Sequence, residues 1–210
     1  MIPEKLESGF RRFREELYPR HRRTYEQLAD KGQRPHTLVI GCSDSRVDPA
    51  AIFDAGPGEL FVVRNVANLV PPFETDGGFH GVSAAVEFAV TALEVANILV
   101  MGHRQCGGVH ACAAGAPKDG SLFVGHWVSA LDPALAESRA ELGTHAPVEA
   151  IADDLELRAI RHSIERLRTY PFVAEAVADG RLRLHGARFG VADGRLEWME
   201  DDGSFSVFED

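Results

Sequence analysis

The sequence lacks any long apolar run. Of its 210 residues, 45% are hydrophobic, yet no stretch approaches the roughly 18 consecutive apolar residues that a membrane span needs. The first ten residues, MIPEKLESGF, also lack the apolar segment of a secretory signal. We therefore expect a cytoplasmic protein that has no membrane partner.

Positive charge is scarce as well. The chain has 22 Lys and Arg against 32 Asp and Glu, which gives a formal net charge of -10. Nucleic acids and anionic membrane surfaces favour basic proteins. This balance argues against a general nucleic-acid binder and favours a small-molecule substrate or a protein partner.

Cysteine is the third scarce component, with only Cys42, Cys106 and Cys112 present. An odd number of cysteines in a protein expected to be cytoplasmic argues against a disulfide framework. The thiols are therefore available to bind a metal. Cys112 lies in the alanine-rich stretch ACAAGA, without the polar neighbours typical of a ligand, so we expect it to be an ordinary buried residue.

The apolar patterns that are present predict alternating strands and helices. Short runs at 37–41, 60–63 and 97–102 predict buried strands, and the alternating stretch 181–189 predicts a fourth. Apolar residues from Val82 to Leu93 recur at helical spacing, and the segment from 107 to about 170 is mainly helical in pattern. Residues 194–199 and 204–208 are candidate edge strands.

This order predicts an α/β/α fold with a central, mostly parallel four-stranded sheet plus an edge strand. The length fits a single domain over residues 1–210, with an α/β core at 36–210. Residues 1–30 are expected to form a helical arm, interrupted at Tyr18-Pro19. Its apolar residues, such as Leu6 and Phe10, suit packing against another chain.

Polar and sulfur-bearing side chains follow the predicted strands. Ligands of open parallel sheets bind beyond the carboxyl ends of the strands, so one edge of the sheet should gather Cys42, Asp44, Arg46, Arg64, His103 and Cys106. Two thiolates and one imidazole suit zinc, and a fourth position remains for water or a displaceable carboxylate. We therefore predict that Cys42, His103 and Cys106 bind a metal. Arg64 fits either the site itself or a structural role, pinning a loop carbonyl or a nearby carboxylate.

Three segments resemble, in the same order, the signature blocks of the beta-class carbonic anhydrases: CSDSRVDP at 42–49, PGELFVVRNVANLVPP at 57–72 and GHRQCGG at 102–108. The resemblance continues through SAAVEFAV at 83–90 and, more weakly, through 166–173 and 181–186. It therefore covers most of the chain. The combination of Cys-x-Asp-x-Arg with a later His-x-x-Cys-Gly-Gly is specific.

The resemblance implies one Zn²⁺ per chain, bound by Cys42, His103 and Cys106, and reversible hydration of carbon dioxide to bicarbonate and a proton by zinc-bound hydroxide. Asp44 and Arg46 become a catalytic dyad beside the metal. Asp44 either pairs with Arg46 and accepts a hydrogen bond from the zinc water, or takes the fourth zinc position in an inactive state. Two thiolates acidify zinc-bound water less than three histidines do, so we expect activity to rise above neutral pH.

The resemblance also implies a homodimer or a dimer of dimers, with amino-terminal arms over the neighbouring chain. Some family members hold inhibitory bicarbonate with a tryptophan, a glycine and a tyrosine, where this chain has Val39, Gly41 and Phe189. Two of those three groups are missing, so we expect Asp44 to be off the metal at mildly alkaline pH.

Two alternative functions stay open on the sequence. The first is hydrolysis of carbonyl sulfide or carbon disulfide on the same scaffold, because similar chemistry acts on other linear triatomic molecules. The second is a non-catalytic, zinc-stabilised interaction domain, in which Asp44 closes the metal site permanently.

Overall fold

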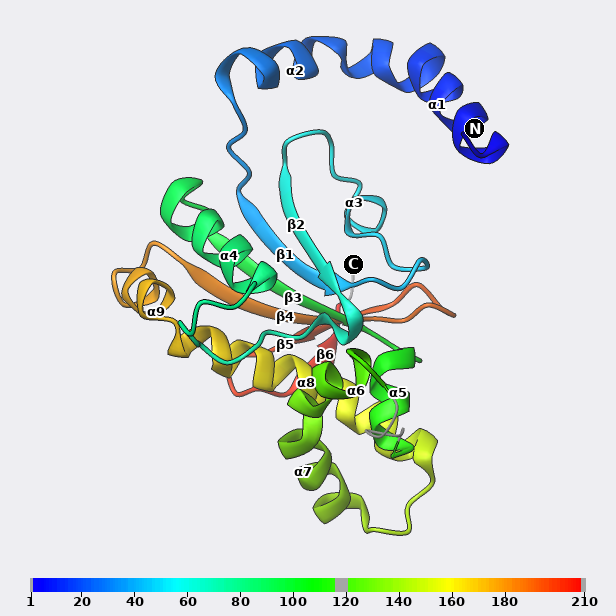
Figure 1. Cartoon of the computed structure of the whole chain (residues 1–210), viewed down its shortest axis with the longest axis vertical. Helices are drawn as coiled ribbons and strands as arrows, with labels where there is room; N and C mark the ends of the chain where they lie inside the picture. Colours follow the sequence, from blue (N-terminus) through cyan, green and yellow to red (C-terminus); the bar gives the residue numbers. More distant parts are fainter. Residues whose placement is uncertain (1, 116–120, 209–210) are drawn as a thin grey trace.

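A six-stranded sheet forms the centre of the computed structural model, which describes residues 2–115 and 121–208 (Figure 1). The strands are β1 Thr37–Cys42, β2 Leu60–Asn65, β3 Asn97–His103, β4 Arg183–Phe189, β5 Leu196–Met199 and β6 Phe205–Val207, in the order β2-β1-β3-β4-β5-β6. The first four are parallel, and β5 and β6 pair antiparallel at one edge. The predicted fold class is confirmed, with one strand more than predicted because both carboxyl-terminal segments join the sheet.

Strand register explains why polar groups gather at one edge. In the parallel pair of β1 and β2, Cys42 lies opposite Asn65, and in the pair of β3 and β4, His103 lies opposite Phe189. β1 and β3 are neighbours at the centre of the sheet. The ends of these two strands therefore bring Cys42 and His103 to the same edge.

The helices lie on the sheet, beyond its ends and in the arm. They are α1 Glu4–Arg12, α2 Tyr18–Lys31, α3 Pro49–Ile52, α4 Gly81–Glu87, α5 Gly107–Ala113, α6 Val124–Val128, α7 Asp132–Leu142, α8 Val148–Thr169 and α9 Pro171–Ala178. Short 3-10 helices occur at η2 Val66–Asn68 and η4 Ser129–Leu131, and π-helical turns at η1 Phe13–Leu17 and η3 Phe88–Ala92. The helix predicted from Val82 to Leu93 is present as α4 and η3. None of the described helices is long and apolar enough to cross a membrane.

Two apolar clusters pack on opposite sides of the sheet. Alternate residues of a strand point to opposite faces, and here Leu38 and Ile40 belong to one cluster and Val39 to the other. The first cluster joins β1 and β3 to α4, α8 and α9. The second joins them to α5, α7 and the first half of α8. Helix α8 therefore contacts both clusters, and it passes close to the edge where the polar residues gather.

The amino-terminal arm lies away from the sheet (Figure 1), and α1, η1 and α2 contain no buried residue. The expected interruption at Tyr18-Pro19 is present only as a change of helix type, because η1 ends at Leu17 and α2 begins at Tyr18 while both residues keep right-handed helical backbone angles. Pro19 lies in the first turn of α2, where a missing N–H is tolerated. The π-helical turn at Phe13–Leu17 precedes it, so the arm follows one helical path. Leu6 and Phe10 are 65% and 62% exposed.

Candidate metal centre

Cys42, His103 and Cys106 form a compact group of metal-binding side chains. Their ligand atoms all lie within 4.8 Å of one another, and the two Sγ atoms are 3.9 Å apart. Cys42 ends β1, His103 ends β3, and Cys106 caps the amino terminus of α5. All three residues are buried. The structure therefore brings together the three donors predicted from the sequence.

His103 presents its free nitrogen to the two thiols. Its Nδ1 lies 3.0 Å from the carbonyl oxygen of Arg104, which assigns the proton to Nδ1 as the donor. Nε2 is buried and has no hydrogen-bond partner among the described residues. A buried polar atom without a partner is uncommon, and a lone pair facing two sulfurs suits a metal ion. The donor set of one imidazole and two thiols fits zinc.

The two thiols share one hydrogen bond. The pKa of Cys42 is lowered because its sulfur accepts a hydrogen bond from Cys106, and the pKa of Cys106 is raised because its proton is held in that bond and because the thiol is buried. Backbone N–H groups of Asp44 and Ala67 further lower the pKa of Cys42, and those of Gly108 and Val109 act on Cys106. These donors stabilise sulfur in its charged form, which is the form that binds a metal.

Asp44 and Arg46 lie beside the three donors as a bidentate ion pair. Arg46 Nε donates to Asp44 Oδ1 at 2.9 Å, and its Nη2 donates to Oδ2 at 2.8 Å. These contacts hold the pKa of Asp44 well below its usual range. Asp44 Oδ2 is 3.9 Å from His103 Nε2. All five predicted site residues thus meet in one place, and a direct bond from Asp44 to the metal stays a prediction.

Of the two roles considered for Arg64, a part in the site or a structural one, its contacts support the structural role. Its Nε donates to the carbonyl of Cys42 at 2.8 Å, and its Nη2 donates to the carbonyl of Asp44 at 2.6 Å. Its Nη1 is 3.2 Å from Asp48 Oδ2, while Asp48 also caps α3 through the N–H of Ala50. Arg64 therefore fixes the loop that carries Cys42 and Asp44.

The backbone next to the site packs tightly against α5. Ala67 and Asn68 have positive φ angles of 64° and 47°, a backbone region that residues other than glycine adopt infrequently. Gly108, in the first turn of α5, faces this segment, and a Cβ added at Gly108 would lie 2.6 Å from Val66 Cγ1 and 3.2 Å from Ala67 Cβ. A Cβ added at Gly107 would meet no atom within 4 Å.

Replacing Gly108 by alanine should therefore destabilise the fold by about 1–3 kcal/mol, because the stiff side chain of Val66 must move to admit the new methyl group. Gly107→Ala is the matched control and should be neutral or slightly stabilising, since alanine favours helix over glycine. Urea unfolding of both variants measures the difference. Equal stabilities would show that α5 can move away from η2 without cost.

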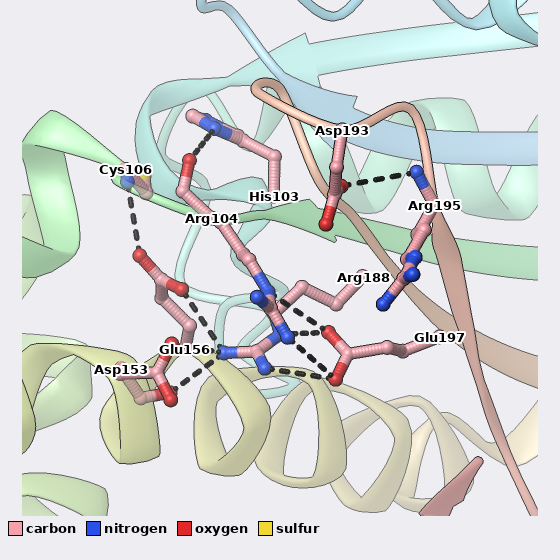
Figure 2. Close-up of polar contacts among 9 residues, drawn as sticks. All are labelled: His103, Arg104, Cys106, Asp153, Glu156, Arg188, Asp193, Arg195 and Glu197. Carbon is pink, nitrogen blue, oxygen red and sulfur yellow. Dashed lines mark hydrogen bonds and ion pairs between the residues drawn. The ribbon is translucent and has the colours of Figure 1, made fainter. Parts of the chain in front are cut away.

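Two buried charged residues behind the site were not identified from the sequence. Glu156 of α8 and Arg188 of β4 are 4% and 2% exposed, and Glu156 Oε1 accepts the backbone N–H of Cys106 at 3.0 Å (Figure 2). Burial raises the pKa of Glu156. A signal was present, because Glu156 lies four residues after Ala152 and three before Ala159 on the buried face of α8. A carboxylate on an apolar helix face needs a partner, but the pattern does not show which one.

Comparison with known proteins points to one family. The family model described as carbonic anhydrase matches residues 37–196. A carbonic anhydrase of Pseudomonas aeruginosa is 40% identical over 192 residues, which are 91% of this chain and 85% of that protein. The matched segment contains the complete Cys42, His103 and Cys106 group.

Solved structures show the same fold. The beta-carbonic anhydrase CcaA superimposes with a TM-score of 0.88 and 31% identity, and covers 98% of both chains. One of two tetrameric beta-carbonic anhydrases from Sordaria macrospora gives a TM-score of 0.82 and 28% identity, over 96% of this chain and 97% of that one. The likeness therefore extends over the arm, the sheet and the carboxyl-terminal strands.

Proposed function

Because this chain belongs to the family of beta-class carbonic anhydrases, which are lyases, we propose that it binds one zinc ion per chain and catalyses the reversible hydration of carbon dioxide. The observation that carries the proposal is the group of two buried thiols and an imidazole nitrogen that has no hydrogen-bond partner in the described part of the chain. Bicarbonate and a proton are the products.

Cys42, His103 and Cys106 are the residues that would hold the zinc. Zinc in such a site supplies a Lewis acid that lowers the pKa of a water molecule and makes it a nucleophile at moderate pH. The remaining polar groups of the site then have to orient this water and accept its proton. The fourth position must stay accessible for that chemistry.

We assign the orienting role to Asp44, with Arg46 as its partner. Arg46 donates to both oxygens of Asp44, which keeps the carboxylate ionised and fixed in direction. An ionised carboxylate can only accept hydrogen bonds. A water molecule beside it must therefore point an O–H bond at Asp44 and keep a lone pair for carbon dioxide. The alternative state, with Asp44 as a zinc ligand, requires this ion pair to break.

The proposal is tested by measuring zinc per chain together with carbon dioxide hydration in a stopped-flow assay with a pH indicator, at neutral and alkaline pH. We expect one zinc per chain and a rate that rises above neutral pH. Release of sulfide from carbonyl sulfide without carbon dioxide hydration would support the hydrolase alternative instead. Stoichiometric zinc without turnover at any pH would support the non-catalytic domain.

We propose in addition that two or more copies of the chain associate through the arm. No residue of α1, η1 or α2 is buried, and Ile2, Leu6 and Phe10 are more than half exposed. Isolated helices with an exposed apolar face gain stability by packing. The Sordaria macrospora relative, which shares the fold over almost its full length, is tetrameric.

Replacing Phe10 by glutamate should weaken self-association by at least about tenfold, because each chain then loses an apolar contact and buries a charge at the interface. Arg23→Glu, at another exposed position of the arm, is the matched control and should leave the association unchanged. Sedimentation velocity at several protein concentrations measures both. A Phe10→Glu chain with unaltered self-association would remove the arm from the interface.

A further inference from the structure

The peptide bond between Gln105 and Cys106 is held from both of its ends. Its carbonyl oxygen, which belongs to Gln105, accepts from Arg46 Nη2 at 3.2 Å. Its N–H, which belongs to Cys106, donates to Glu156 Oε1 at 3.0 Å. The oxygen and hydrogen of a trans peptide point in opposite directions, so these two contacts act against rotation of the peptide plane.

Gln105 itself has an unusual backbone conformation. Its φ is +58°, in the left-handed region that residues other than glycine rarely adopt. Gln105 is the last residue of the turn between His103 and Cys106, so its conformation sets where the second sulfur lies relative to the imidazole. Rotation of the Gln105–Cys106 peptide plane would change ψ of Gln105 and φ of Cys106 and would move Cys106 Sγ away from its position 3.9 Å from Cys42 Sγ.

Glu156 is itself held by Arg188, which extends from β4 toward α8 (Figure 2). Arg188 Nη1 lies 3.3 Å from Glu156 Oε2 and 2.8 Å from Asp153 Oδ1. Its Nε and Nη2 donate to the two carboxylate oxygens of Glu197 in β5, at 2.6 and 3.0 Å. The buried guanidinium thus has three carboxylate partners, and the carboxylate of Glu156 is not left without a countercharge.

The same network also reaches the second metal-binding residue of this turn. The side chain of Arg104 donates to Glu197 at 3.1 Å, and its backbone carbonyl is the partner of His103 Nδ1. The contacts therefore run from Arg104, whose carbonyl is the partner of His103, to Glu197 and Arg188. From Arg188 they continue through Glu156 to the N–H of Cys106 (Figure 2). Side chains from helix α8 and strands β4 and β5 therefore support the turn from behind.

We propose that Glu156, held by Arg188, is a positioning residue of the metal centre, which fixes the Gln105–Cys106 peptide and through it the sulfur of Cys106. Groups that orient metal ligands from behind contribute strongly to metal affinity although they never touch the metal. This role rests on the metal binding of the proposed function and does not depend on the reaction that the metal catalyses.

The test compares Glu156→Leu with Glu156→Gln. Leucine removes the acceptor but fills the space, and Arg188 keeps two carboxylates, so the chain should still fold. We expect zinc release to a chromophoric chelator to become about 10- to 100-fold faster in Glu156→Leu. Glutamine keeps an oxygen that can accept the Cys106 N–H, and its release rate should stay close to that of the wild type.

Asp153→Asn is the matched control, because this residue also pairs with Arg188 from α8 but, among the described residues, makes no hydrogen bond to the turn. It should release zinc like the wild type. In cobalt-substituted protein, the thiolate-to-cobalt charge-transfer absorption should change in Glu156→Leu alone. The proposal is overturned if Glu156→Leu matches Asp153→Asn in both measurements, or if Glu156→Gln loses metal as fast as the leucine variant.

These measurements separate this proposal from the proposed function. A wild-type chain that binds zinc but does not hydrate carbon dioxide refutes the function, and the release rates of the variants still decide the role of Glu156. A wild-type chain that takes up no zinc overturns both.

Discussion

Replacing Cys42 by serine should abolish both zinc retention and carbon dioxide hydration. Substitution of a residue that only orients a metal ligand lowers metal affinity by about 10- to 100-fold. Loss of a direct ligand should therefore weaken zinc binding by more than about 100-fold. Serine has nearly the same shape, but its hydroxyl is not a thiolate, and the backbone N–H groups that stabilise charge at Cys42 would face a neutral oxygen. Zinc content after dialysis against a chelator, and the stopped-flow rate, measure the effect.

Cys112→Ala is the matched control for this variant. Cys112 is buried in the apolar cluster that contains α5, and it is not part of the metal-binding group. We expect this change to lower stability by about 1 kcal/mol, as deletion of one buried group does, while zinc content and activity stay at the wild-type level. Full zinc retention in Cys42→Ser would show that the metal is bound elsewhere and would remove the central observation behind the proposed function.

The donors of the metal centre could be predicted because each follows a strand that the sequence marks clearly. The runs at 37–41 and 97–102 are short, apolar and bounded by turn residues, which is the pattern of buried parallel strands. Once those strands are placed side by side, Cys42 and His103 must lie at one edge. The role of Arg64 was not decided in this way, because a strand-end arginine fits either role until its carbonyl partners are known.

The support behind the centre could not be predicted, because it joins segments that are far apart in the chain. Glu156 lies on the apolar face of α8, but its partner Arg188 belongs to β4 and Glu197 to β5, and nothing in their sequence positions links the three residues. Only the tertiary fold shows that they meet. At Tyr18-Pro19 the helix changes type without a break in the chain path for a local reason, since a proline is tolerated in the first turn of α2.

Replacing Asp44 by asparagine should lower kcat/KM for carbon dioxide by about 100-fold or more, because the attacking water loses the acceptor that orients it, while zinc stays bound. Asparagine has the same size but no charge, and its amide nitrogen cannot accept from Arg46 or from water. One of the two bonds that the guanidinium of Arg46 makes to this side chain is therefore lost. Retained zinc distinguishes this result from that of Cys42→Ser.

Asp48→Asn, four residues further along the same loop, provides the comparison. Asparagine caps a helix about as well as aspartate does, so the cap of α3 should survive, and only the contact with Arg64 at 3.2 Å should weaken. We expect zinc content and kcat/KM close to those of the wild type. If Asp44→Asn hydrated carbon dioxide as fast as Asp48→Asn, the carboxylate would not be the group that orients the attacking water, and its pairing with Arg46 would serve only to shape the loop.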